Sequence, residues 1–254
     1  MNKQSDYKSD CLTLKGGVSD VTPKFVPIGF GAVVGGVKTT FTAKSQESVY
    51  LKALLCDATT FGVVNDIRIG NQSLNCSDSA IELKTFTEFG QRRPVIGLAV
   101  DGNIQMSIDV TLDGAGSESF QGGFTCEAIE KAPTIAQQGN AINKFFGLGS
   151  VSVPSAGTAQ LTAQALRDCM LKDLLIKAHE ANSFGLVVTD ITIKGRSIFS
   201  GQSGDAVGVN ALNEYAQSSL VAVNTAIETN ERVVVTFANN TAGAIVVSGA
   251  FYAE

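Results

Sequence analysis

The chain has 254 residues, a length that suits one large domain or two small ones. Apolar residues make up 44% of it and charged residues 17%, and the formal net charge of −5 argues against a phosphate-binding surface. No run of about 18 apolar residues is present, so the sequence predicts no membrane-spanning helix.

The chain starts with a polar stretch, and we expect residues 1–23 to form an arm outside the folded part. Its first part, MNKQSDYKSDCLTLKGG, contains no apolar core of signal-peptide length. The five cysteines are an odd number in a chain with no visible secretion signal. We therefore expect free thiols in a protein made in a reducing cytoplasm.

After the arm, short segments alternate between apolar and polar residues: TTFTA, VYLKALL, NDIRI, IGLAV, QMSIDVTL and FQGGFTCEAI. Turns rich in glycine, asparagine and aspartate separate them, a pattern that predicts a β-sandwich. About eight strands per repeat favour a jelly roll over a seven-stranded immunoglobulin-like domain. Three other stretches have helical character: DSAIELKTFTEFG, TIAQQGNAINKFF and GVNALNEYAQS.

The second half of the chain repeats the first. VVNDIRIGNQSL (63–74) and VVTDITIKGRSI (187–198) share the pattern Val-x-Asp-Ile-x-Ile-x-x-x-Ser-(Leu/Ile). Three further blocks match in the same order, namely those that start at Lys24 and Lys144, at Phe41 and Leu161, and at Asn103 and Asn230. We therefore predict two tandem duplicated jelly rolls, 24–130 and 144–254, joined by a linker at 131–143, each large enough for its own core.

The duplication helps to separate structural from catalytic residues, because a catalytic residue need exist in only one copy. The polar positions that recur are Lys24/Lys144, Lys52/Lys172, Asp66/Asp190, Ser73/Ser197 and Glu127/Glu254. We interpret the repeated aspartate and serine as structural residues that bond backbone N–H groups at strand corners. The 14 phenylalanines lie mostly at strand-interior spacing, which predicts core positions, and we expect Phe124 and Phe251 to be buried.

The sequence offers little that could carry catalysis. His179 is the only histidine, whereas Ser-His-Asp, Cys-His and multi-histidine metal sites all need histidine with partners. A pair of carboxylates could serve a glycosidase, but no spacing selects two from Glu47, Glu82, Glu88 and Asp101. We expect no enzyme activity, no catalytic residues and no cofactor.

Metal and phosphate sites are not favoured either. Four cysteines meet a small or apolar residue in the other copy, and none has zinc-ligand spacing: Cys56, Cys76, Cys126 and Cys169. We interpret them as small buried hydrophobic residues. The glycine-rich stretch 29–36 leads into another strand, so we interpret its glycines as turn and bulge residues. Calcium at DGNIQ or DGAGSES stays an open alternative, although both lack EF-hand spacing.

Two copies of the pattern TA…LK.LL…V.DI.I…S…G.F..E in one chain resemble the double jelly-roll major capsid proteins of tailless icosahedral bacteriophages. Tectiviruses, corticoviruses and finnlakeviruses have such coats, and adenovirus hexon is a distant relative. The resemblance is architectural and covers residues 24–254. The chain departs from the family in being short and in lacking a long tower-forming insertion.

This resemblance implies a homotrimer whose six jelly rolls form a pseudo-hexagonal capsomer of an icosahedral shell. It also implies a virion location, assembly in the host cytoplasm, and neighbouring capsomers and minor capsid proteins as partners. An internal membrane often lies beneath such shells. Because the arm has mixed charge, we expect no direct sequence-specific binding of nucleic acid.

The alternative is a β-sandwich binding, adhesion or spike protein that recognises a cell-surface ligand. Such surfaces depend on tryptophan and tyrosine, and this chain has no tryptophan and only 4 tyrosines. The composition therefore favours the capsid interpretation. Solution mass separates the two, because a trimer supports a capsomer and a stable glycan-binding monomer supports an adhesin.

Overall fold

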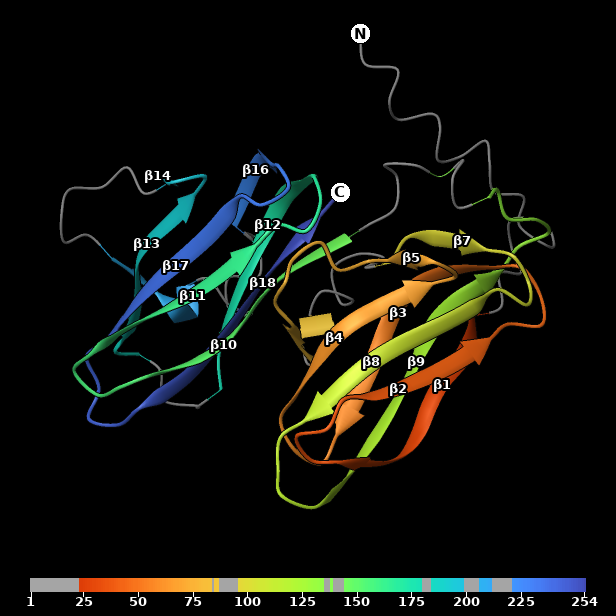
Figure 1. Ribbon diagram of the computed structural model, residues 1–254, viewed down its shortest axis with the longest axis horizontal. Coiled ribbons are helices and arrows are strands. Elements are labelled where there is room, and N and C mark those ends of the chain that lie inside the picture. Colours follow the sequence, from red (N-terminus) through yellow and green to blue (C-terminus); the bar gives the residue numbers. More distant parts are fainter. Residues whose placement is uncertain are drawn as a thin grey trace, which may run out of the picture. The chain divides into compact units, whose positions relative to one another are not determined.

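The computed structural model describes residues 23–83, 85–86, 96–134, 138, 144–179, 184–198, 206–211 and 221–254 (Figure 1). The chain divides into two compact units. The first comprises Met1–Leu74 and Phe86–Asn143, and the second comprises Asn75–Thr85 and Lys144–Glu254. Asn75–Thr85 therefore belongs to the second unit, although the sequence on both sides of it belongs to the first. No helix in the described part is long and apolar enough to span a membrane.

The described part of the first unit is an antiparallel sandwich of two sheets. Its strands are β1 (Pro23–Val34), β2 (Thr39–Lys44), β3 (Val49–Ala58), β4 (Gly62–Ile69), β5 (Gln72–Ser73), β7 (Leu98–Val100), β8 (Gln105–Leu112) and β9 (Ser117–Ala128). One sheet has the order β1-β9-β3-β7 and the other β2-β8-β4-β5. This interleaving of early and late strands is the jelly-roll order.

The second unit repeats that order. Its strands are β10 (Lys144–Val153), β11 (Thr158–Gln164), β12 (Cys169–Ala178), β13 (Leu186–Ile193), β14 (Arg196–Ser197), β15 (Val207–Gly208), β16 (Val221–Ile227), β17 (Arg232–Asn239) and β18 (Ile245–Ala253). The sheets are β10-β18-β12-β16 and β11-β17-β13-β14, and β15 pairs with β13. The predicted fold class, two tandem jelly rolls, is confirmed.

Irregularities in the strand register also recur at corresponding places. The register shifts between Pro27 and Gly29 in β1, and between Gly147 and Gly149 in β10. A second matched pair of shifts lies in β3, between Leu51 and Ala53, and in β12, between Leu171 and Asp173. A third lies in β4, between Val64 and Asp66, and in β13, between Val188 and Asp190. A bulge bends a strand and changes which side chains face the core. The duplication therefore preserves side-chain directions as well as strand order.

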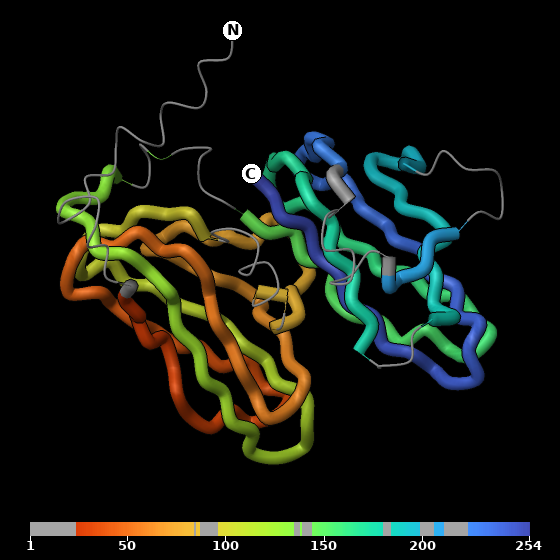
Figure 2. The backbone as a smooth tube through the Cα atoms, turned by 180° about the vertical axis from the view of Figure 1, so that it is seen from behind, coloured from red at the N-terminus to blue at the C-terminus, as the bar shows by residue number. Residues whose placement is uncertain are grey.

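Each unit, taken by itself, has its core between its two sheets, which lie as layers (Figures 1 and 2). Alternation produces this core: Met106, Ile108, Val110 and Leu112 of β8 are buried, whereas the residues between them are not. Phe124 and Phe251 are both fully buried, which confirms the prediction made for them. The ring of Phe251 packs edge-on against Phe146, with centroids 6.2 Å apart.

The three stretches with helical character lie largely outside the described residues. The first contains a short strand, β6 (Ile81–Glu82), after which Leu83, Thr85 and Phe86 are helical as expected. The second, TIAQQGNAINKFF, runs into β10, which starts at Lys144. Within the third there is one 3-10 turn, η3 (Val209–Ala211).

Candidate functional site

The repeated aspartate and serine form the same contact in both units. Ser73 Oγ donates a hydrogen bond to Asp66 Oδ1 at 2.5 Å, and Ser197 Oγ donates to Asp190 Oδ1 at 2.5 Å. Each pair links a strand to the two-residue strand that follows it, β4 to β5 and β13 to β14. These contacts fit the interpretation of both residues as structural, and the bond between the two side chains was not predicted.

Two further recurring polar positions form an ion pair in each unit. Lys52 pairs with Glu127, and their counterparts Lys172 and Glu254 lie 3.5 Å apart. Each pair joins two neighbouring strands of one sheet, β3 with β9 in the first unit. Polar residues that recur through the duplication thus connect strands, which is a structural role.

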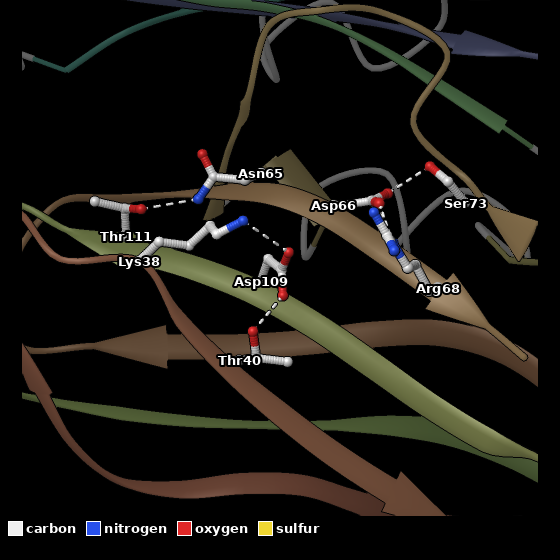
Figure 3. A network of polar contacts seen from close by, with 8 residues as sticks. All are labelled: Lys38, Thr40, Asn65, Asp66, Arg68, Ser73, Asp109 and Thr111. Atoms are coloured by element: carbon white, nitrogen blue, oxygen red, sulfur yellow. Dashed lines mark hydrogen bonds and ion pairs between the residues drawn. The ribbon is translucent and has the colours of Figure 1, made fainter. Parts of the chain in front are cut away.

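The outward face of the β2–β8–β4 layer is polar (Figure 3). Thr40 Oγ1 donates to Asp109 Oδ1 at 2.6 Å, and Lys38 Nζ lies 3.4 Å from Asp109 Oδ2. Asn65 Nδ2 donates to Thr111 Oγ1 at 2.8 Å. Cross-strand pairs of this kind satisfy one another at a solvated sheet surface. This face of the first unit is therefore typical of a surface that stays in water.

Three of the four candidate carboxylates lie in the described part of the chain. Glu47 is ion-paired with Lys24, and Asp101 accepts hydrogen bonds from Ser48 Oγ and the Ala132 N–H. Glu82 is buried in the second unit, whereas Glu47 and Asp101 belong to the first. Glu88 lies outside the described residues.

His179 is not surrounded by solvent. Its Nε2 lies 3.1 Å from Ser248 Oγ, and its backbone N–H donates to the carbonyl of Val246. Ser248 is 1% exposed in the middle of β18, where no substrate could reach its hydroxyl. The contact therefore holds the end of β12 against β18. Among the described residues, no group of three or more metal-ligating side chains is close enough to hold an ion.

The four described cysteines are thiols: Cys56, Cys76, Cys126 and Cys169. Burial raises the pKa of the Cys56 thiol, and that of Cys126 in the same way. Cys76 and Cys169 contact each other, a pairing that the sequence did not predict. A hydrogen bond from Cys169 lowers the pKa of the Cys76 thiol, and nearby Arg167 acts in the same direction. Cys11 lies outside the described residues.

That pairing follows from an unexpected packing of residues 75–83, here called the inserted segment. Cys76 belongs to the apolar core of the second unit. Its N–H donates to the carbonyl of Phe145 at 2.7 Å, and its carbonyl accepts from the N–H of Leu166 at 2.8 Å. Two further bonds join the segment to β10. Ser77 Oγ donates to the Gly147 carbonyl at 2.8 Å, and the Ala80 carbonyl accepts from the Gly149 N–H at 3.0 Å. A stretch that follows β5 thus completes the second jelly roll.

A hollow in the second unit is lined by Ile193, Lys194, Arg196, Ser197, Ile198, Thr225 and Glu231. The ammonium group of Lys194 lies 2.9 Å from Glu231 Oε2. The hydrogen bond from the backbone N–H of Glu228 and this contact with Lys194 both lower the pKa of Glu231. Two basic side chains and one acidic side chain thus line the hollow, and Lys194 pairs with Glu231.

No family model matches the chain, and no curated protein matches its sequence. Among solved structures, it is similar at 11% identity to one of the Sulfolobus turreted icosahedral virus, with a TM-score of 0.26 over 94% of this chain and 61% of that one. A structure of the triple jelly-roll fold and turret assembly of an archaeal virus gives 11% identity and a TM-score of 0.25, over 93% and 59% of the two chains.

A third similar structure is recombinant peptide:N-glycanase F, with 10% identity and a TM-score of 0.33 over 91% of this chain and 95% of that one. The chain spans about 60% of the length of the two viral structures. Similarities of this size do not assign a function. The fold follows from the strand order of the two units themselves.

Proposed function

We propose that this protein is a structural capsid protein whose trimer forms a pseudo-hexagonal capsomer. One observation carries the proposal: two jelly rolls in one chain share strand order and the positions of three register irregularities. Three chains in a ring would present six nearly equal jelly rolls. Such a ring has the outline of a hexagonal tile, although its symmetry is only threefold.

The contacts inside each unit support this structural role. The recurring polar side chains link strands to one another, as Asp66 does with Ser73 and Lys52 with Glu127. A shell subunit needs such a rigid frame, and it needs outward surfaces that bind copies of itself. Under this proposal the partners are neighbouring capsomers and minor capsid proteins, and the protein is located in the virion.

The arm has a separate role in the proposal. It precedes β1 and lies outside the duplication, so it is available to reach a neighbouring capsomer or an internal membrane. We expect a variant that lacks residues 1–22 to keep the trimer, because β1 starts at Pro23 and stays intact. We expect the same variant to form shells or sheets less readily than the full chain.

Electron microscopy of both proteins at high concentration tests the proposal. We expect the full chain to form sheets or shells with hexagonal order, and the variant to form fewer of them under the same conditions. Equal lattices from both proteins would remove the role proposed for the arm. A full chain that forms no lattice and binds glycans as a monomer would support the adhesion alternative.

A further inference from the structure

An apolar patch lies on the first unit, on the outward side of the β1–β9–β3 layer. It consists of Phe25, Phe30, Val34 and Leu55, which are 53%, 87%, 60% and 39% exposed, and we call it the first outer face. Phe25 and Phe30 depart from the expectation that the phenylalanines lie in the core. Single exposed apolar residues are ordinary on protein surfaces, whereas several on one sheet face mark an interaction site.

The strand register places these side chains on one side of the sheet. Phe25 lies opposite Thr125 and Phe30 opposite Gln121, while Leu55 lies opposite Gly123. The ring of Phe25 extends over Gly123, where an added Cβ would come within 2.1 Å of its Cζ. Phe25 and Leu55 thus adjoin across a glycine, and the patch is continuous there.

The duplication supplies a direct comparison, because the second unit has the same side chain at two of these four positions. Phe145 corresponds to Phe25 by its place relative to the matched register shifts in β10 and β1. Leu175 corresponds to Leu55 by the matched shifts in β12 and β3. In the second unit these two residues are only 0% and 3% exposed. A phenylalanine and a leucine on the same sheet face are therefore exposed in one copy and buried in the other.

The inserted segment lies on this face of the second unit. Asn75 pairs with Phe145 at the edge of the sheet. The carbonyl oxygens of Ser79 and Ala80 lie above Gly147, where an added Cβ would approach them to 2.5 and 2.6 Å. Chain that follows β5 thus lies beside Phe145 and over Gly147 on the outward face of the second unit.

We propose that the first outer face binds a second copy of this chain. The second copy would cover this face as the inserted segment covers the corresponding face of the second unit. The inference rests on the proposed function, since a capsomer is the assembly in which each jelly roll contacts the next. In the sequence, the stretch that corresponds to the inserted segment follows Ser197, in the second unit. A neighbouring chain can therefore offer the matching contact.

This arrangement repeats one type of contact around a ring. Within a chain, the inserted segment, which follows the β4–β5 hairpin, covers the second unit. Between chains, the stretch that follows Ser197 would cover the first unit of the next chain. A head-to-tail contact of this kind closes into a ring when its rotation allows. Phe25 and Phe30 suit the centre of such a contact, because large aromatic side chains supply much of the binding energy at interfaces.

Phe30→Ser tests the proposal with a change that the fold already tolerates, because Ser150 occupies the corresponding position of β10. Phe184→Ser is the matched control, since Phe184 is 84% exposed and lies outside the first outer face. Circular dichroism and thermal melting should show that both variants keep the fold of the unaltered chain.

Sedimentation equilibrium then measures the association of all three proteins. We expect Phe30→Ser to weaken association at least tenfold, and Phe184→Ser to leave it unchanged.

The outcomes separate this inference from the proposed function. Trimers of equal strength from all three proteins would overturn the inference and leave the capsomer intact. A monomeric unaltered chain would overturn both. The arm could instead cover the face within one chain. Labelling of a Phe30→Cys variant with maleimide tests this alternative. If the arm covers the face, the thiol resists maleimide in the dilute monomer and reacts once residues 1–22 are removed. That result would also overturn the inference.

Discussion

Asp66 and Asp190 each accept a hydrogen bond from a serine seven residues further along the chain. The repeated motif predicted that these aspartates occupy equivalent positions, because a residue kept in both copies has a structural task. It did not predict the partner atoms. Those depend on the register shifts before Asp66 and Asp190, which turn the carboxylates toward Ser73 and Ser197.

Substitutions at Phe124 and Phe251 test whether single core residues stabilise each unit. Both rings are fully buried on the last strand of their unit. We expect Phe124→Ala and Phe251→Ala each to lower the free energy of unfolding by about 3–5 kcal/mol, through lost apolar burial and the cavity left behind. Chemical denaturation measures the loss, and Phe184→Ala, at a residue 84% exposed, is the control. Equal stability of all the variants would show that the rings do not hold the sheets together.

The inserted segment is the element that the sequence did not predict. Its residues are mostly small and polar, so they resemble an ordinary loop between two strands. No pattern in the neighbouring residues marks Cys76 as a core residue of the second unit, and its counterpart in the repeat is a serine, Ser200. The contact partners, Phe145 and Leu166, lie about 70 and 90 positions away, and pattern reasoning on neighbouring residues does not reach that far.

Gly147→Ala tests the packing of this element. A Cβ there would collide with the carbonyl oxygens of Ser79 and Ala80, which are backbone atoms with little room to move. We expect a loss of about 1–3 kcal/mol in stability. We also expect hydrogen exchange at the backbone amides of residues 76–80 to become at least tenfold faster.

Gly208→Ala is the control for that experiment, because a Cβ at Gly208 meets nothing within 4 Å. Both glycines lie in strands of the second unit, so the two variants differ mainly in what their methyl groups touch. Unchanged exchange in Gly147→Ala would mean that the inserted segment does not rest on β10.

At the scale of the whole molecule, the duplication carried the sequence interpretation furthest. Self-alignment predicted two jelly rolls, and both units have that strand order. The first outer face could not be predicted in this way. Phe25 and Phe145 have the same place in the repeat, yet Phe25 is 53% exposed and Phe145 is buried, a difference that the repeat does not reveal.

The measurement that tests the proposed function most directly is sedimentation equilibrium of the full chain across the micromolar range. The chain has a mass of 26.5 kDa, and we predict a species three times heavier, about 80 kDa. Closed threefold association is what makes two jelly rolls per chain into a six-sided tile. A single species of 26.5 kDa at every concentration would contradict the capsid proposal.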